Sequence, residues 1–207
     1  MSASGTASAV DAIEAAPARG AGRPRSAEAD AAILAAAIEE FAEHGYEGLR
    51  VEAIAERAGV AKSTLYRRYP NKTDLLQAAL WQARSTDPPV PHTDSLEQDL
   101  FVVVRRLRDT FASDDIGRLI PTILEAGSRH PEFASAHREY ITERRRGGLE
   151  RVAAAITDGD LPDDTDVQLF MDMAVGAIFY RSFVSGAALD DDTLHELVRQ
   201  TLRAHRR

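Results

Sequence analysis

The chain has 207 residues, no cysteine and a formal net charge of −8 at pH 7. The lack of cysteine excludes disulfides, thiolate metal sites and thiol nucleophiles. The acidic balance argues against a protein that coats nucleic acid with its whole surface, although it leaves room for a local basic patch. Hydrophobic residues make up 44% of the chain, which is enough to build a core for one or two domains.

Residues 1–25 consist mainly of Ala, Ser, Gly, Pro and Arg. Because such a segment buries too little apolar surface to offset the entropy lost on ordering, we predict a disordered arm. The arm has no continuous apolar core and therefore does not resemble a signal peptide. It ends in Gly22-Arg23-Pro24-Arg25, a small basic cluster.

The segment that follows has the apolar periodicity of helices. Ser26 is a suitable N-cap for a first helix, which His44-Gly45 ends because Gly readily adopts the left-handed cap conformation. Two shorter helices are predicted at residues 51–58 and 62–69, and a fourth starts near Asn71 and runs toward Trp81.

The loop Asp87-Pro88-Pro89-Val90-Pro91 separates these helices from the rest of the chain. No stretch shows the sustained two-residue alternation of a strand. The predicted fold is therefore all-α, with a three-helix N-terminal domain at 26–72, a helical bundle at 73–207 and about nine helices in total. The predicted helices after the loop lie near 94–112, 115–129, 131–157, 165–187 and 191–205.

The stretch from Leu169 to Leu189 is apolar enough to suggest a membrane span. It contains Asp172 and Arg181, however, and a charge at mid-bilayer costs about 2.5–3.5 kcal/mol. We therefore predict a buried or interface helix, and no membrane partner.

Residues 51–72 have the pattern of two short helices joined by a tight turn, Ala58-Gly59-Val60-Ala61. This is the plan of a helix-turn-helix, whose second helix enters the major groove of DNA. From Arg57 to Lys72 the chain carries five basic side chains and no acidic one. A basic island on an acidic protein indicates local contact with DNA. The alternative is a solvated basic helix that contacts nothing.

Leu65 and Tyr69 are predicted to face the core from this second helix, at a spacing of one helical turn. The remaining side chains face outward or flank the helix, and their hydroxyls and cations suit phosphates and base edges. They are Lys62, Ser63, Thr64, Tyr66, Arg67 and Arg68.

The segment 45–72, GYEGLRVEAIAERAGVAKSTLYRRYPNK, resembles the DNA-binding domain of the TetR family of bacterial transcriptional regulators, and the match spans about residues 26–80. The resemblance implies an all-helical homodimer that binds double-stranded DNA at an operator, most often as a repressor. It also implies a C-terminal domain that holds the dimer face and a small-molecule pocket, where ligand binding releases the operator. On this basis, residues 73–207 are the ligand-binding and dimerisation domain.

By position in the family motif, Thr64 and Tyr66 match the usual contacts of the recognition helix. Lys62, Ser63 and Arg68 lie at neighbouring contact positions, and Lys72 matches a lysine that meets phosphate. Arg50 departs from the pattern, because the family more often has a Ser or Thr there that caps the helix. In the arm, Arg23 and Arg25 are candidates for the adjacent minor groove, with a tail that only aids solubility as the alternative.

The segment from Asp166 to Leu189 is similar to the penultimate helix of one actinobacterial-type TetR C-terminal subfamily. That resemblance implies that this helix and the last one pair with their copies across a two-fold axis. An ordinary core helix is the alternative. The predicted dimer-interface residues are Val175, Phe179, Phe183, Leu194, Leu197 and Val198.

A ligand pocket in the bundle interior would be lined by apolar side chains with a few polar ones. The predicted apolar lining is Phe111, Leu119, Ile123, Met171, Ile178 and Phe179, with Glu125, Tyr140 or Arg181 as polar partners. Each of these residues is also a candidate for plain core packing.

An enzyme is the first competing hypothesis. The six histidines form no metal-binding pair at helical spacing, and the chain has no phosphate-binding glycine loop and no nucleophile elbow. We therefore predict a cytoplasmic regulator with no catalytic residues, no metal and no cofactor. The second hypothesis is a DNA-binding protein without an effector, whose bundle would be packed shut, whereas a receptor would hold a ligand-sized cavity.

Overall fold

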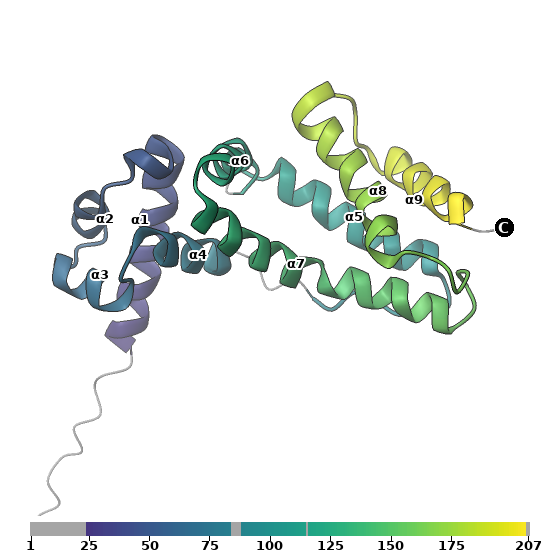
Figure 1. Cartoon of the computed structure of the whole chain (residues 1–207), viewed down its shortest axis with the longest axis horizontal. Coiled ribbons are helices and arrows are strands. Elements are labelled where there is room, and N and C mark those ends of the chain that lie inside the picture. The colour runs from purple at the N-terminus through teal and green to yellow at the C-terminus, as the bar shows by residue number, and fades with distance from the viewer. Residues whose placement is uncertain (1–23, 84–87, 115, 206–207) are drawn as a thin grey trace, which may run out of the picture.

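The computed structural model describes residues 24–83, 88–114 and 116–205. These residues form nine α-helices and no strand, which confirms the predicted all-α class. The molecule is elongated, and α1 (Pro24–Gly48), α2 (Val51–Arg57) and α3 (Lys62–Arg68) form one end of it (Figure 1). Most of the predicted arm, residues 1–23, lies outside the described part of the chain.

The first helix begins at Pro24, two residues before the predicted cap at Ser26. Its regular part ends where predicted, because Gly45 has a φ of 70° and a ψ of −174°, and a short turn then continues to Gly48. A side chain with a Cβ would be strained at this φ.

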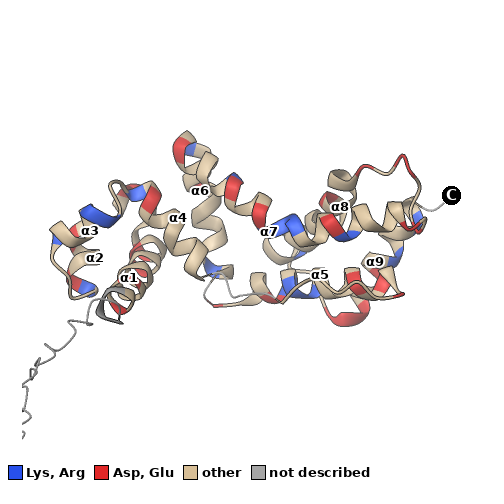
Figure 2. Cartoon of the chain, turned by 90° about the horizontal axis from the view of Figure 1, so that it is seen from below, with Lys and Arg blue, Asp and Glu red and all other residues tan. Residues whose placement is uncertain are grey.

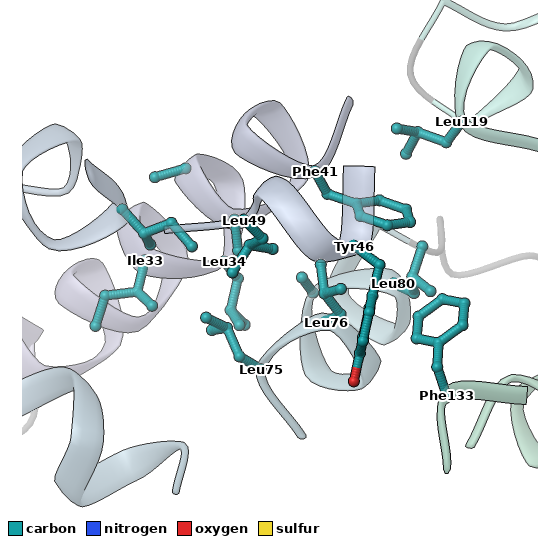
Figure 3. Close-up of a cluster of buried hydrophobic side chains, with 14 of the residues drawn as sticks. Ile33, Leu34, Phe41, Tyr46, Leu49, Leu75, Leu76, Leu80, Leu119 and Phe133 are labelled. Atoms are coloured by element: carbon teal, nitrogen blue, oxygen red, sulfur yellow. The ribbon is translucent and has the colours of Figure 1, made fainter. Parts of the chain in front are cut away.

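The helix α4 (Lys72–Ala83) joins the three-helix end to the bundle. It packs chiefly on α1 and also on α7 (Pro131–Thr157). One continuous apolar cluster therefore runs from Ile33 and Phe41 of α1, through Leu76 of α4, to Phe133 of α7 (Figure 3). The helix-turn-helix is thus not a separate body: its core is shared with the near end of the bundle.

The other helices of the bundle are α5 (Leu96–Ala112), α6 (Ile120–Arg129), α8 (Val167–Tyr180) and α9 (Asp191–His205), with a 3-10 turn, η1 (Gly117–Leu119), before α6. The predicted helix at 165–187 ends earlier as an α-helix. Its last turn, η2 (Arg181–Ser185), is π-helical, and Gly186 with a φ of 63° then reverses the chain. A second apolar cluster fills the space between α5, α7, α8 and α9.

The helix α8 is apolar on two sides. One side, with Phe170, Ala174 and Ile178, is buried in the second cluster. The other side is open: Leu169 is 54% exposed, Met173 42%, Tyr180 57% and Val184, in η2, 63%. By length and composition alone, residues 167–185 could cross a membrane. The buried side and the ion pair of Asp172 with Arg145 (2.6 Å) instead fit a helix of a soluble bundle.

Candidate DNA-binding site

The helix-turn-helix is held by a small core and a tight turn. Leu65 of α3 is 1% exposed and packs with Ile54 and Ala55 of α2 in the first apolar cluster. In the turn, Gly59 has a φ of 65°, and the Val60 N–H donates to the Ala55 carbonyl at 2.9 Å. This geometry fixes how α3 is presented at the end of the molecule.

The outer face of α3 carries the side chains suited to DNA. Lys62, Ser63, Tyr66 and Arg67 are exposed, with Tyr66 at 48%. Thr64 is half-buried in the first turn of the helix. Hydroxyl, phenol and guanidinium groups on a free helix face match what phosphates and base edges accept.

Figure 2 shows acidic residues on α1 and basic residues on α3 at the same end of the molecule. Three of the five basic side chains of the island are paired with carboxylates. The Arg57 guanidinium binds Glu39 at 3.0 Å and Glu43 at 3.1 Å, both on α1. Lys62 Nζ lies 3.1 Å from Glu52 Oε1. Such exposed pairs contribute only about 0–1 kcal/mol, so phosphate can replace the carboxylate.

The two remaining arginines of α3 differ. Arg68 is predicted to contact DNA, yet its half-buried side chain forms an ion pair with Asp30 of α1. Arg67 is exposed and forms no ion pair with any residue that the structure describes. Arg67 is therefore the cation of α3 whose charge is not offset by a carboxylate of the described residues.

Arg50 does not cap α2, since its side chain makes no cap hydrogen bond. Instead its Nε lies 3.4 Å from Oε1 of Glu40, a fully buried carboxylate. The departure from the family pattern thus has a local reason: Arg50 and Arg57 both face this buried charge.

Lys72 lies at the start of α4, beside the end of α1. Its Nζ donates to the Tyr46 carbonyl at 2.9 Å and lies 4.1 Å from the centre of the Tyr46 ring. The Tyr46 hydroxyl is 2.6 Å from Thr73 Oγ1 and donates to Glu132 of α7 at 3.3 Å. The predicted phosphate contact is therefore tied into the connection between α1, α4 and α7.

The arm arginines are not placed by the structure. Arg23 lies outside the described residues, and Arg25 falls in the first turn of α1 with its side chain outside the described part.

One group of side chains has the reach to hold a cation. Ligand atoms of Glu40, Glu43 and His44 lie within 4.8 Å of one another. Arg57 occupies the same place, with its guanidinium 3.1 Å from Glu43 and 3.7 Å from Glu40. Because this guanidinium already neutralises the carboxylates, the group is better explained as an ion-pair network.

A cavity of about 590 Å³ lies in the bundle. Of the predicted lining, Phe111, Ile123, Tyr140 and Met171 border it. The other predicted residues do not line the cavity. Leu119 and Ile178 are fully buried in the apolar clusters, Glu125 is exposed beside Arg129, Phe179 packs against other phenylalanines, and Arg181 donates to the Ala188 carbonyl.

The sequence prediction missed the polar wall of this cavity. Arg106 of α5 and Arg144 and Arg151 of α7 line it, together with Gly148. The signal was present on α7, where residues 144, 148 and 151 share one helical face. Nothing in the sequence alone distinguishes that face from a solvated one.

The predicted dimer residues also divide. Leu194 and Val198 are 0% and 2% exposed, within the protomer's own core. Val175 lines the cavity, and Leu197 packs against the second cluster. Phe179 and Phe183 pack their rings against Phe111. The open apolar side of α8 instead belongs to Leu169, Met173, Tyr180 and Val184.

Two family models match the chain. The model of bacterial regulatory proteins of the tetR family matches residues 33–79. The model of the tetracyclin repressor-like C-terminal domain matches residues 90–201. Together they cover both the helix-turn-helix and the bundle that holds the cavity.

Individual proteins show the same similarity. The HTH-type transcriptional regulator YdeS of Bacillus subtilis is 32% identical over 86% of this chain and 89% of its own length. A DNA-binding transcriptional repressor TetR of Mycobacteroides abscessus is 29% identical over 83% of this chain and 90% of its own. A crystal structure of a TetR family transcription regulator has a TM-score of 0.64 and 28% identity, covering 85% of this chain and 97% of that one.

Proposed function

The chain belongs to the TetR family of helix-turn-helix transcriptional regulators, and from this premise we propose that it is a cytoplasmic, homodimeric repressor. It reads a palindromic operator with α3, and a small molecule in the bundle cavity releases it. The observation that carries this proposal is the presence, in one chain, of an exposed polar face on α3 and a ligand-sized cavity.

The reading surface is the outer face of α3. Ser63, Thr64 and Tyr66 supply hydrogen-bonding groups, and Arg67 supplies a cation. In a two-fold dimer two such helices lie about 34–36 Å apart, one turn of the duplex, so a palindromic site follows from the symmetry.

The open side of α8 is the proposed dimer surface. Four large apolar side chains are exposed there on one helix face, and apolar patches of this kind mark interaction sites. The helix α8 lies far from α3 along the molecule (Figure 1), so a partner that packs on α8 leaves both reading helices free.

The cavity lies between the two surfaces. Its lining includes Leu80 of α4 and Ile120 of α6, and α4 packs on α1 within the first apolar cluster. A ligand that moves α4 or α6 therefore moves the reading head. By linkage, DNA must then weaken ligand binding by the same factor that the ligand weakens DNA binding.

The alternative is a DNA-binding protein without an effector. Its bundle would be packed shut, whereas a volume of about 590 Å³ falls in the range of about 300–1,000 Å³ of small-molecule sites. The cavity favours a receptor. The family is one of regulators rather than enzymes, and we propose no catalytic activity.

The test is selection of DNA from a random duplex library by the purified protein at two salt concentrations. We expect enrichment of one palindrome and an affinity that falls steeply with salt. Enrichment of no sequence, with only weak salt-sensitive binding, would contradict the proposed operator reading.

Variants then assign the roles on α3. Thr64→Ala is expected to relax the preference at particular base positions, while Arg67→Ala weakens binding to all sequences and reduces the salt slope by about one per lost phosphate contact. Arg203→Ala is the matched control, because it removes one positive charge from α9, at the other end of the molecule. An Arg67→Ala variant that behaves like the control would contradict this placement.

A further inference from the structure

The cavity has two chemically different parts. The part toward α6 and the end of α5 is apolar, with Leu107, Phe111, Ile120, Ile123 and Ile141 among its lining. The part along the second half of α7 is rich in arginine. Among the residues that the structure describes, five arginines border the cavity. The arginines are Arg106, Arg144, Arg145, Arg146 and Arg151.

Arg151 is the most deeply buried of these arginines. It is 4% exposed, and its Nε donates to Asp99 Oδ2 at 2.7 Å. Its Nη1 is buried and donates no hydrogen bond to any group that the structure describes. A buried donor without a partner costs about 1–3 kcal/mol, and more when it is charged. A ligand that supplies an acceptor to this cavity-lining donor would remove that cost.

The same condition recurs along the cavity. Four buried side-chain nitrogen or oxygen atoms in the described part of the chain lack a hydrogen-bond partner. Three of them belong to cavity-lining residues: Nη1 of Arg151, Nε of Arg145 and Nδ1 of His137. Orphaned polar atoms thus concentrate at this site, as expected for groups whose partner is a ligand.

Arg106 of α5 adds a further cation to the lining of the cavity. Its Nη1 donates to the Pro88 carbonyl at 2.6 Å, a neutral acceptor that leaves the charge of the guanidinium uncompensated. Arg146, in contrast, is 62% exposed and binds Glu143 at 2.8 Å and Glu150 at 3.5 Å. Arg106 therefore keeps a charge, and Arg151 a buried donor, that an anion can use, whereas Arg146 is paired with two carboxylates.

We propose that the cavity binds an amphiphilic carboxylate, with its head group at Arg151 and Arg106 and its apolar body toward Ile120 and Phe111. The inference rests on the proposed function, whose effector site it uses, and it names the chemical class of the ligand. Ile141 and Arg151 lie ten residues apart on one helix, about 15 Å at 1.5 Å per residue. This separation suits a ligand with a medium-length alkyl chain between head and tail.

His137 fits the apolar end of this arrangement. Burial lowers its pKa from the ordinary value, so the imidazole is neutral at pH 7 and adds no charge there. The anionic head is thus directed to the arginine end, and the hydrocarbon body to the other.

The chain contains a reporter for this site. Trp81 is its only tryptophan, and its ring lies 5.5 Å from the ring of Tyr140, which lines the cavity. We would titrate the dimer with dodecanoate, 1-dodecanol and dodecyltrimethylammonium below their aggregation concentrations, and follow Trp81 fluorescence. Dodecanoate is expected to bind saturably and at least tenfold more tightly than either analogue. Equal affinity for the alcohol, or no saturable binding of dodecanoate, would overturn the proposal.

Variants locate the head group. Arg106→Gln and Arg151→Met are expected to weaken dodecanoate binding about tenfold while leaving the dodecanol affinity unchanged. Arg106→Gln keeps the test valid if Arg151→Met fails to fold, because Arg106 is only half-buried. Arg146→Gln is the matched control and should bind dodecanoate as the wild type does. Equal losses in all three variants, or no loss in Arg106→Gln, would overturn the assignment.

These titrations contain no DNA, so the ligand class and the proposed function fail separately. Selective binding of dodecanoate without release of the selected operator would support the ligand class and contradict release by ligand. A protein that binds the operator normally but does not distinguish dodecanoate from dodecanol would contradict the ligand class and leave the proposed DNA binding supported.

Discussion

At the scale of single residues, one buried ion pair, Asp99 with Arg151, joins two helices of the bundle. Asp99 is 0% exposed and accepts hydrogen bonds from Arg151, from the Thr93 N–H at 3.0 Å and from the Thr93 hydroxyl at 2.8 Å. Burial alone would raise the pKa of this carboxyl, but the hydrogen bonds outweigh burial and hold the pKa below its ordinary value. Asp99 is therefore charged at pH 7 and joins α5 to α7.

Removal of that charge should be costly. Asp99→Ala leaves Arg151 buried without a counter-charge, and we expect the free energy of unfolding to fall by about 3–5 kcal/mol in urea titrations. Asp109→Ala is the control on the same helix, because this carboxylate is 60% exposed in its pair with Arg108 and should matter by less than about 1 kcal/mol. Similar losses in the two variants would show that the buried pair has no special role.

The buried imidazole of His137 predicts a pH dependence. Because its folded-state pKa lies below the unfolded value of 6.5, the unfolded chain binds the proton more readily. The contribution is fully present above pH 6.5 and is lost as the pH falls through the folded-state pKa. The unfolding free energy should thus drop between pH 7.5 and 5.5, and drop less in His137→Asn. An identical drop in both proteins would exclude His137 as a source.

At the scale of helices, the turn between α2 and α3 is set by Gly59. Its φ of 65° belongs to the left-handed region, while a Cβ added there would meet no atom within 4 Å. The requirement for glycine is therefore conformational rather than steric.

A substitution at Gly59 therefore tests backbone strain without a steric clash of the new side chain. Gly59→Ala should cost about 1–2 kcal/mol of stability, the strain of a left-handed residue, and should weaken operator binding because α3 shifts. Gly127→Ala in α6 also adds its Cβ to open space, but at a helical backbone, so it should be neutral or stabilising. Thermal unfolding of both variants makes the comparison, and an unperturbed Gly59→Ala would count against the turn geometry.

The ends of helices could be predicted from the sequence where the backbone preference of a single Gly or Pro determines them. Gly45 and Gly59 stand at positive φ, and α7 begins at Pro131 as expected. The burial of a side chain could not be predicted where it depends on a partner far away in the sequence. Arg151 lies in a strongly charged helix, and it is buried because Asp99, 52 residues earlier, lies opposite.

The apolar helix α8 shows the same limit. Its sequence marks many apolar positions, but only packing decides which of them the protomer covers itself. Phe170 and Ile178 are covered, whereas Leu169 and Val184 are open. Leu194 and Val198, which the sequence predicts at the dimer interface, are core residues of the protomer for the same reason.

At the scale of the whole molecule, the three proposed sites follow one another along the long axis. The helix α3 lies at one end of the molecule and α8 lies toward the other (Figure 1), and the cavity is lined by residues of α4 to α8. In the proposed regulator, a signal between ligand and DNA would pass along α4, α6 and α7, which lie between the cavity and α3.

The dimer surface can be tested by charge. Met173→Glu is expected to place two carboxylates in the apolar contact, so the protein should sediment at the mass of a single chain and lose at least tenfold in operator affinity. Leu124→Glu is the control: Leu124 is a similarly exposed apolar residue, at 50%, but lies on α6. Sedimentation of Met173→Glu as a wild-type dimer would exclude this side of α8.

Lys72 lies where the N-terminal helices meet the bundle, so a contact of its side chain can affect both parts of the molecule. Its ammonium group holds the Tyr46 carbonyl and ring, and the Tyr46 hydroxyl reaches Glu132 of α7. A phosphate that binds the Lys72 ammonium group would compete with the Tyr46 carbonyl, and would so weaken the contact between α1 and the bundle. If Lys72 binds phosphate as proposed, its ammonium group takes part both in DNA binding and in the contact between the N-terminal helices and the bundle. We then expect the salt concentration to change the affinity for the proposed ligand as well as the affinity for DNA, although Lys72 does not line the cavity.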